Sequence, residues 1–404
     1  MISRRKAIAT AAGVAAGATL AGCGGTSNAA AWHEPPPSPS PSTPPVDVTF
    51  TPVADATNVL PGSPVVVAVS GGTLQTVSVA AGGKAVAGAL DADGRTWRST
   101  DALAYGLTYT VTASAVDGKG APVQKTCSFT TVKPTATASI TFQANAMQIL
   151  KTGGTYGVGQ PAVVRFSKAV TDKAAAEKAI TVQTSPSVDG KFFWLDKQTV
   201  HWRPEKYWAT GTTIKVTVNA LGVNLGGGVY GASNASTNFT IGRSLIAYAD
   251  NNAHYTQVFV NGQMVRNMAC SLGKGGYTTA ADGSQIHFWT QNGVHVVLEK
   301  DQTVRMTSSS YGITNKSDPN YYDEEVQLCT RISYSGEYLH SAPWNMADHG
   351  KRNSSHGCIN LSPEDAQWVF DNFMLGDVVE VKNSPKPLPV WDGLGDWQLG
   401  YDQY

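Results

Sequence analysis

Short runs of alternating hydrophobic and polar residues dominate the chain between residues 46 and 242. Runs such as 64–69 and 213–218 are separated by segments rich in Gly, Asp, Asn and Pro. An alternation with a period of two places the apolar side chains on one face of a strand. Short strands at this spacing are typical of immunoglobulin-like β-sandwiches. We therefore predict two such domains, at residues 46–133 and 134–242.

Two local signals refine this prediction. The segment Asp91-Ala92-Asp93-Gly94 favours a tight turn between two strands. Residues 172–179 favour one short helix, for which Thr171 is the expected N-cap. Neither domain contains a cluster of His, Cys and carboxylate residues. We interpret both domains as spacers, with a specific binding role as the alternative.

The pattern changes after residue 243. Strand-like runs at 245–248, 257–260 and 294–298 precede a stretch rich in Ser, Gly, Asn and Asp at 307–323. Such a stretch beside a site is typical of a mobile lid, which keeps water away from a reactive intermediate.

A capped helix is expected near the end of the chain. Ser362 suits the N-cap and Pro363 the first helical position, and the two acidic residues that follow face the positive end of the helix dipole. We expect the helix to end at Gly376 and to be followed by a strand. The tail at 384–404 contains Trp and Tyr residues, so we expect it to pack on the preceding domain.

The first 23 residues have the pattern of an export signal. A basic start precedes an apolar run at 7–20, which is shorter than the roughly 20 residues that a membrane span needs. Leu20-Ala21-Gly22-Cys23 resembles the bacterial lipoprotein cleavage box, which implies a lipid anchor on Cys23; an ordinary cleaved signal is the alternative. The Pro-rich segment at 24–45 favours extended polyproline II, a stiff spacer. We expect an exported chain held at the outer face of a membrane.

Composition limits the partners and the class of protein. The chain has 404 residues, enough for two to four domains. Lys and Arg together number 30, as do Asp and Glu, so the net charge is zero and no basic surface indicates nucleic acid. The five cysteines show no disulfide-framework or zinc spacing. Cys270 and Cys329 are expected in one domain, as a pair or as separate buried thiols.

Cys358 is the candidate nucleophile. His356, two residues earlier, and His340, across a loop, are both possible bases that would favour the reactive thiolate. Gly357 leaves the backbone bare beside the sulfur, where N–H groups meet a developing oxyanion. The alternatives are a buried structural cysteine and a zinc site made of Cys358 and the two histidines, for which no fourth ligand is spaced.

Two blocks of sequence carry a resemblance. His340-Ser341-Ala342-Pro343-Trp344, followed by Ser355-His356-Gly357-Cys358-Ile359-Asn360, resembles the signature of the L,D-transpeptidases, whose catalytic domain is of the YkuD type. The order of lipoprotein signal (1–23), linker, two immunoglobulin-like domains and catalytic domain is similar to the mycobacterial enzymes. The resemblance implies a mainly β fold with a β-rich catalytic domain at 243–383 and one short helix after the catalytic Cys.

The resemblance also implies roles for named residues. Cys358 would be the nucleophile, His340 its base, and Ser341 the residue that orients the imidazole through its backbone oxygen. Tyr322 and the N–H groups of Gly357 and Cys358 would stabilise the oxyanion. The remaining residues implied in shaping the substrate pocket are His356, Asn360, Tyr311, Met306 and Trp344.

The implied reaction is a two-step acyl transfer in peptidoglycan. The thiolate attacks the carbonyl of the third-position diamino acid of a tetrapeptide stem and expels D-Ala, and an amine of an acceptor stem resolves the thioester. Carbapenem β-lactams would acylate the same sulfur, and no metal or cofactor is implied. The alternatives are an L,D-carboxypeptidase, in which water is the acceptor, and a non-catalytic lipoprotein that binds the wall.

Overall fold

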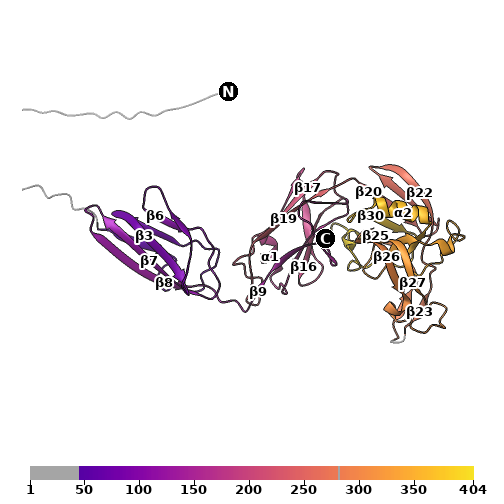
Figure 1. Cartoon of the computed structure of the whole chain (residues 1–404), viewed down its shortest axis with the longest axis horizontal. Helices are drawn as coiled ribbons and strands as arrows, with labels where there is room; N and C mark the ends of the chain where they lie inside the picture. Colours follow the sequence, from indigo (N-terminus) through magenta and orange to yellow (C-terminus); the bar gives the residue numbers. More distant parts are fainter. Residues whose placement is uncertain (1–44, 281–282) are drawn as a thin grey trace, which may run out of the picture. The chain divides into compact units, whose positions relative to one another are not determined.

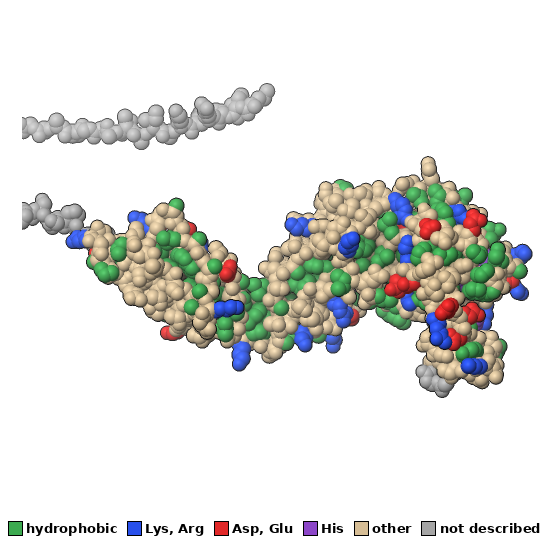
Figure 2. Space-filling view, in the orientation of Figure 1, with side chains coloured by type: hydrophobic (Ala, Val, Ile, Leu, Met, Phe, Trp, Pro, Cys, Tyr) green, Lys and Arg blue, Asp and Glu red, His purple; other side chains and the backbone are tan. Residues whose placement is uncertain are grey.

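The computed structural model describes residues 45–280 and 283–404. The signal peptide 1–23 with Cys23, and the linker 24–45 apart from its last residue, lie outside the described residues. Strands dominate the described chain, which confirms the mainly β class. None of the described helices is long and apolar enough to cross a membrane. Neutral side chains cover most of the face in Figure 2, in keeping with a charged fraction of 15%.

The first domain consists of two four-stranded sheets, in the orders β1-β2-β6-β5 and β4-β3-β7-β8 (Figure 1). Their inward side chains, including Val67, Val111 and Phe129, form a separate hydrophobic core. The predicted turn is confirmed, because the Gly94 N–H donates to the Asp91 carbonyl at 2.9 Å between β5 and β6. The strands are β1 Asp47–Thr51, β2 Val66–Ser70, β3 Gly72–Ala81, β4 Lys84–Ala85, β5 Gly88–Leu90, β6 Thr96–Ser99, β7 Thr108–Asp117 and β8 Pro122–Thr130.

The second domain has its own core between a five-stranded sheet, β11-β10-β13-β16-β15, and a four-stranded sheet, β12-β19-β17-β14. Helix α1 spans Lys173–Ala179, and its N-cap is Asp172, whose carboxylate accepts from Ala175 N–H at 3.0 Å. The expected cap, Thr171, was therefore wrong by one position. The strands are β9 Ala136–Ala138, β10 Ile140–Asn145, β11 Gln148–Ile149, β12 Gly154–Tyr156, β13 Ala162–Phe166, β14 Ile180–Ser185, β15 Gly190–Trp194, β16 Thr199–Pro204, β17 Thr213–Val218, β18 Val229–Gly231 and β19 Ala235–Ile241.

A nine-stranded sheet, in the order β25-β30-β20-β21-β22-β29-β28-β27-β26, organises the third domain. Helix α2, Pro363–Asn372, begins as predicted, with Ser362 as its N-cap, but ends four residues before Gly376. The long strands β26 and β27, which flank the expected lid, were not predicted. The strands are β20 Leu245–Asp250, β21 Tyr255–Val260, β22 Gln263–Ser271, β23 Tyr277–Thr279, β24 Gln285–His287, β25 Gly293–Val296, β26 Glu299–Thr307, β27 Asp323–Arg331, β28 Tyr338–Ser341, β29 Ile359–Leu361 and β30 Val378–Lys382.

Backbone hydrogen bonds join the second and third domains. Gly157 N–H donates to Leu375 O and Gly159 N–H donates to Gly376 O, each at 2.8 Å. A Cβ on Gly157 would lie 2.2 Å from the backbone nitrogen of Asp377, so only glycine permits this approach. The two domains therefore meet through the main chain as well as through side chains.

The C-terminal tail contacts both of these domains, whereas we expected it on the third alone. Its Asp392 accepts from Ser335 N–H at 2.7 Å in the third domain. The guanidinium of Arg203, a buried residue of the second domain, lies 4.2 Å from the ring of Tyr404 and donates to Leu399 O at 2.9 Å. Trp391 remains 64% exposed and takes no part in this packing.

Candidate active site

Two adjacent parallel strands bring Cys358 and His340 together. In the register of β28 and β29, His340 lies opposite Asn360, and Cys358 directly precedes β29. The two residues therefore stand on neighbouring segments of the sheet. Both side chains line one cavity.

The imidazole of His340 is fixed in one orientation. Its Nδ1 donates to the carbonyl oxygen of Ser341 at 2.9 Å, which leaves Nε2 as the unprotonated nitrogen. Burial lowers the pKa of His340 to about 4, so the ring is neutral at pH 7 and can accept a proton. Ser341 is itself buried and contributes its backbone oxygen to this hydrogen bond.

The thiol of Cys358 is neutral in the resting structure. Burial raises the pKa of Cys358 to about 12, and the carboxyl of Glu337 acts in the same direction. The S–H group points to the carbonyl oxygen of Gly336 at 3.7 Å. We expected an ionised sulfur, but burial outweighs the Tyr338 backbone hydrogen bond and the Arg331 guanidinium, which both act to lower the pKa of the thiol. The resting pair is therefore thiol and neutral imidazole.

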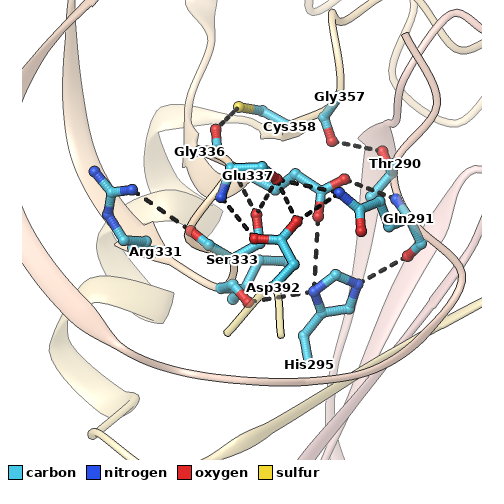
Figure 3. Close-up of polar contacts among 12 residues, drawn as sticks. Thr290, Gln291, His295, Arg331, Ser333, Gly336, Glu337, Gly357, Cys358 and Asp392 are labelled. Atoms are coloured by element: carbon cyan, nitrogen blue, oxygen red, sulfur yellow. Dashed lines mark hydrogen bonds and ion pairs between the residues drawn. The ribbon is translucent and has the colours of Figure 1, made fainter. Parts of the chain in front are cut away.

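The turn that carries the cysteine is held by its own polar groups. Gly357 has a φ of +142°, which favours glycine, and its carbonyl accepts from Thr290 Oγ1 at 2.7 Å (Figure 3). Ser355 Oγ donates to Cys358 O at 2.6 Å and accepts from Gly357 N–H at 3.1 Å. In the resting state the Gly357 N–H thus has a partner, instead of facing an oxyanion.

The cavity that contains the thiol and the imidazole measures about 310 Å³, a size typical of sites for small ligands. Trp344, at its mouth, is 54% exposed and its ring lies 6.0 Å from that of His340. Seven of the residues named from the sequence line it: Met306, Tyr322, His340, Trp344, His356, Cys358 and Asn360.

The other predicted residues lie next to this cavity. Tyr311 and Gly357 line a second cavity that also reaches Cys358. The ring of Tyr322 lies between those of Tyr311 and His356, with centroid distances of 6.1 and 4.9 Å. Burial raises the pKa of Tyr322, so its hydroxyl keeps its proton and can donate. The residues assigned from the sequence to the substrate pocket are therefore gathered around Cys358, whereas Cys23 lies outside the described residues.

Sequence reasoning missed Lys274. Its ammonium donates to Nε2 of His356 at 3.1 Å and to Oδ1 of Asn320, in the predicted lid segment, at 2.7 Å. Burial, and then this ammonium, lower the pKa of His356 to about 4, so His356 is neutral and its Nε2 is occupied. No local pattern marked Lys274, because its partners are 46 and 82 positions away.

Two further cysteines lie in the third domain. Cys270 and Cys329 are separate, buried free thiols. Within residues 45–280 and 283–404, no group of three or more His, Cys, Asp or Glu side chains is arranged to hold a metal ion.

The chain is similar to proteins of known family. Residues 245–381 match the family model of the L,D-transpeptidase catalytic domain, and residues 56–224 match a bacterial Ig domain. L,D-transpeptidase 2 of Mycobacterium tuberculosis is 41% identical over 86% of this chain and 81% of its own length. L,D-transpeptidase 5 of the same species is 35% identical over 100% of this chain and 84% of its own.

Among solved structures, L,D-transpeptidase 3 from M. tuberculosis in complex with a faropenem-derived adduct is similar with a TM-score of 0.46 and 32% identity. The match covers 59% of this chain and 98% of that one. The sequence relatives, whose similarity extends through the Ig-like and catalytic regions alike, identify the chain as a member of the L,D-transpeptidase family.

Proposed function

We propose that the chain cross-links peptidoglycan through a thioester on Cys358, joining the third-position diamino acids of two stem peptides. The observation that carries this proposal is the state of His340. Its Nδ1–H is committed to Ser341 O, and the ring is neutral and lines the cavity that the thiol also lines. This is the arrangement that a general base for thiol attack requires.

In the first step, Nε2 of His340 takes the thiol proton as the sulfur attacks the carbonyl of the donor tetrapeptide. Because both groups are neutral at rest, proton transfer accompanies attack instead of preceding it. Breakdown of the tetrahedral intermediate breaks the C–N bond, and the imidazolium returns the proton to the departing D-Ala amine. The products are a thioester, free D-Ala and neutral His340.

The negative oxygen of the intermediate needs hydrogen-bond donors. Tyr322 lines the cavity beside Cys358, and we assign the side-chain donor role to its protonated hydroxyl, which must leave its resting hydrogen bond to Tyr311. The N–H of Cys358 is the backbone donor. Gly357 contributes its N–H only if the bond to Ser355 Oγ opens during the reaction.

In the second step, an amine of an acceptor stem attacks the thioester and the sulfur leaves, regaining its proton from His340. If water takes the place of the amine, the product is a shortened stem, which is L,D-carboxypeptidase activity. Carbapenems, whose strained ring presents an acylating carbonyl, would form a stable adduct on the same sulfur.

Intact-mass analysis after incubation with meropenem tests the nucleophile. We expect one adduct on the wild-type chain and on Cys329→Ser, and none on Cys358→Ser. An adduct on Cys358→Ser would overturn the assignment. Incubation with disaccharide-tetrapeptide then separates the reactions, since only transpeptidation yields dimers.

We also propose that the chain acts outside the cytoplasmic membrane, tethered by a lipid on Cys23. The signal at 1–23 and the Pro-rich linker support this proposal. Metabolic labelling with a palmitate analogue tests it, with Cys23→Ala as the variant expected to lose the label.

A further inference from the structure

A network of buried polar side chains lies next to Cys358, between the segment at 290–295 and the loop at 332–337 (Figure 3). Glu337 and His295 are two of its titratable members, and they are only 6% and 1% exposed. The reaction proposed for Cys358 gives neither of them a role. Titratable groups buried this completely beside a reactive residue are candidates for a functional role.

Glu337 connects the two hydrogen bonds that hold the turn of the nucleophile. The carbonyl of the preceding residue, Gly336, accepts the S–H of Cys358. On the other side, Oε1 of Glu337 accepts from Gln291 N–H at 2.7 Å, and the hydroxyl of the residue before Gln291 donates to Gly357 O at 2.7 Å (Figure 3). One buried side chain therefore joins the two segments that contact the cysteine turn.

The ring of His295 faces this carboxyl group. Its Nε2 lies 2.8 Å from the carbonyl oxygen of Gln291, which only accepts, so Nε2 carries a proton. Its Nδ1 lies 3.3 Å from Ile332 O and 3.7 Å from Oε2 of Glu337. A second proton can reside on Nδ1 or on Oε2, and in both cases the pair has no net charge.

The other charged groups near Glu337 favour this shared proton. Among the described residues, the only ion-pair partner of Glu337 is His295. Lys386 lines the same cavity as Glu337 but forms no ion pair with it in this part of the chain. Burial raises the pKa of Glu337 to about 8, and Asp392 of the tail acts in the same direction. At pH 7 the pair therefore keeps its second proton.

We propose that Glu337 is a positioning residue that shares one proton with His295 and thereby keeps net negative charge away from the sulfur while Cys358 is acylated. The inference rests on the proposed thioester on Cys358. Attack by the sulfur places negative charge on the former carbonyl oxygen of the substrate. A carboxylate behind the cysteine turn would oppose this charge, whereas a pair that holds its proton does not.

The charge of Glu337 acts on the nucleophile and not on the base. Besides burial, Glu337 raises the pKa of Cys358. The pKa of His340, in contrast, is shifted by burial, by the backbone of Ser341 and by His349. An ionised Glu337 would therefore disfavour the developing anion without an equal gain from the imidazolium.

Loss of the shared proton is expected to slow acylation. As the pH rises past 8, hydroxide takes this proton and forms water, and Glu337 is left ionised beside neutral His295. The Cγ of Glu337 lies 4.0 Å from the position of a Cβ on Gly357, the residue before the nucleophile. Two like charges about 10 Å apart, in a medium with an effective dielectric constant of about 20, repel enough to change a rate roughly tenfold.

The test compares the full chain with two variants at this position. In Glu337→Gln the amide oxygen can still accept from Gln291 N–H, and the side chain does not ionise. Glu337→Ala removes the connection altogether. Glu325→Gln is the matched control, since Glu325 is exposed and lines neither cavity. The readouts are the rate of acylation by meropenem between pH 7 and 9.5, followed by intact mass, and the melting temperature of each chain.

We expect the wild-type rate, divided by the Glu337→Gln rate, to fall about tenfold between pH 7 and 9.5, with a midpoint near pH 8. Glu325→Gln should follow the wild type. At pH 7 Glu337→Ala should be about tenfold slower than Glu337→Gln, because the N–H of Gln291 then lacks its acceptor. Equal pH profiles for the wild type and Glu337→Gln, or a Gln variant as slow as the Ala variant, would overturn the proposal.

A measurement on the wild type covers the case in which the variants do not fold. Carbon-13 NMR of the chain labelled at the Glu carboxyl carbons follows these groups directly. One Glu resonance that titrates above pH 7 supports the shared proton, whereas titration of every Glu near pH 4.3 overturns it. If meropenem does not acylate the wild type at pH 7, it is the proposed function that fails, and the NMR titration still tests the pair.

Discussion

Lys274 and His356 form a hydrogen bond of 3.1 Å, in which the ammonium is the donor and Nε2 of the imidazole the acceptor. This bond assigns the tautomer of His356, whose proton must be on Nδ1. The same ammonium reaches Asn320 in the segment between β26 and β27. One cation thus links the cysteine motif to the segment between β26 and β27.

Replacing Lys274 with Met is expected to loosen this link. Hydrogen bonds to charged groups are worth about 1.5–3 kcal/mol, so donor acylation should slow by roughly 10- to 100-fold. The pKa of His356 should rise, since the ammonium is one of the two causes that lower it. Acylation kinetics and imidazole NMR titration measure the two effects. Lys351→Met, at an exposed position, serves as control, and an unshifted His356 pKa would contradict the account.

The neutral resting state of Cys358 predicts low reactivity toward iodoacetamide. Alkylation needs thiolate, and with a pKa of about 12 the thiol is almost wholly protonated at pH 7. We expect the alkylation rate to rise about tenfold per pH unit between pH 7 and 10. Peptide mapping of residue 358 with time measures it. A rate that is already at its plateau at pH 7 would show a preformed thiolate.

The pH profile of carbapenem acylation should have an unusually wide plateau. The reactive form holds neutral His340, with a pKa of about 4, and neutral Cys358, with a pKa of about 12. The acylation rate should therefore change little between pH 5.5 and 8. If the imidazole had an ordinary pKa near 6.5, the rate would fall within this range as the pH is lowered. His340→Gln should lower the rate by about 10²- to 10⁴-fold. His254→Gln is the matched control and should keep the wild-type rate.

The tail is expected to stabilise the second and third domains together. Asp396 is fully buried, and burial alone would raise its pKa, but His201 at 2.8 Å and Tyr404 Oη at 2.7 Å hold the pKa below its usual value. Hydrogen bonds to a charged group are worth about 1.5–3 kcal/mol, so Asp396→Asn, which removes the carboxylate, should lower the free energy of unfolding by about that amount. Chemical denaturation measures the change, with exposed Asp402→Asn as control.

The stabilisation of the fold by the Asp396 carboxylate should decrease as the pH falls. A carboxyl whose folded pKa lies below its unfolded value of about 3.9 stabilises the fold above that value and loses its contribution as the pH falls. The difference between wild type and Asp396→Asn should therefore shrink below about pH 4. A difference that stays constant down to pH 2 would show that the carboxylate charge is not the cause.

The sequence predicted the two residues to which we assign the chemistry because their signals are local. Cys358 and His340 stand in compact motifs, and Ser362 caps a helix through atoms three residues away. The alternation of residues 64–69 similarly predicted a strand of the first domain. These features depend on neighbours in the chain, so a single sequence can reveal them.

The features that the sequence did not reveal depend on distant partners. Glu337 is unremarkable in sequence, and only folding brings it beside Gln291, 46 positions earlier. The charge state of Cys358 also escaped prediction, because burial outweighs the neighbouring histidine and depends on the whole domain. Strands β26 and β27 were missed because their solvent-facing polar residues mask the alternation.

The main-chain contacts of Gly157 and Gly159 with Leu375 and Gly376 bear on how this enzyme can be divided. A fragment that begins at residue 243 would leave two carbonyl groups without their donors and uncover the surface beneath them. The smallest piece that melts as a single cooperative unit should therefore start near residue 134. A chimera that joins the third domain to a different preceding domain would need glycines at the positions equivalent to Gly157 and Gly159.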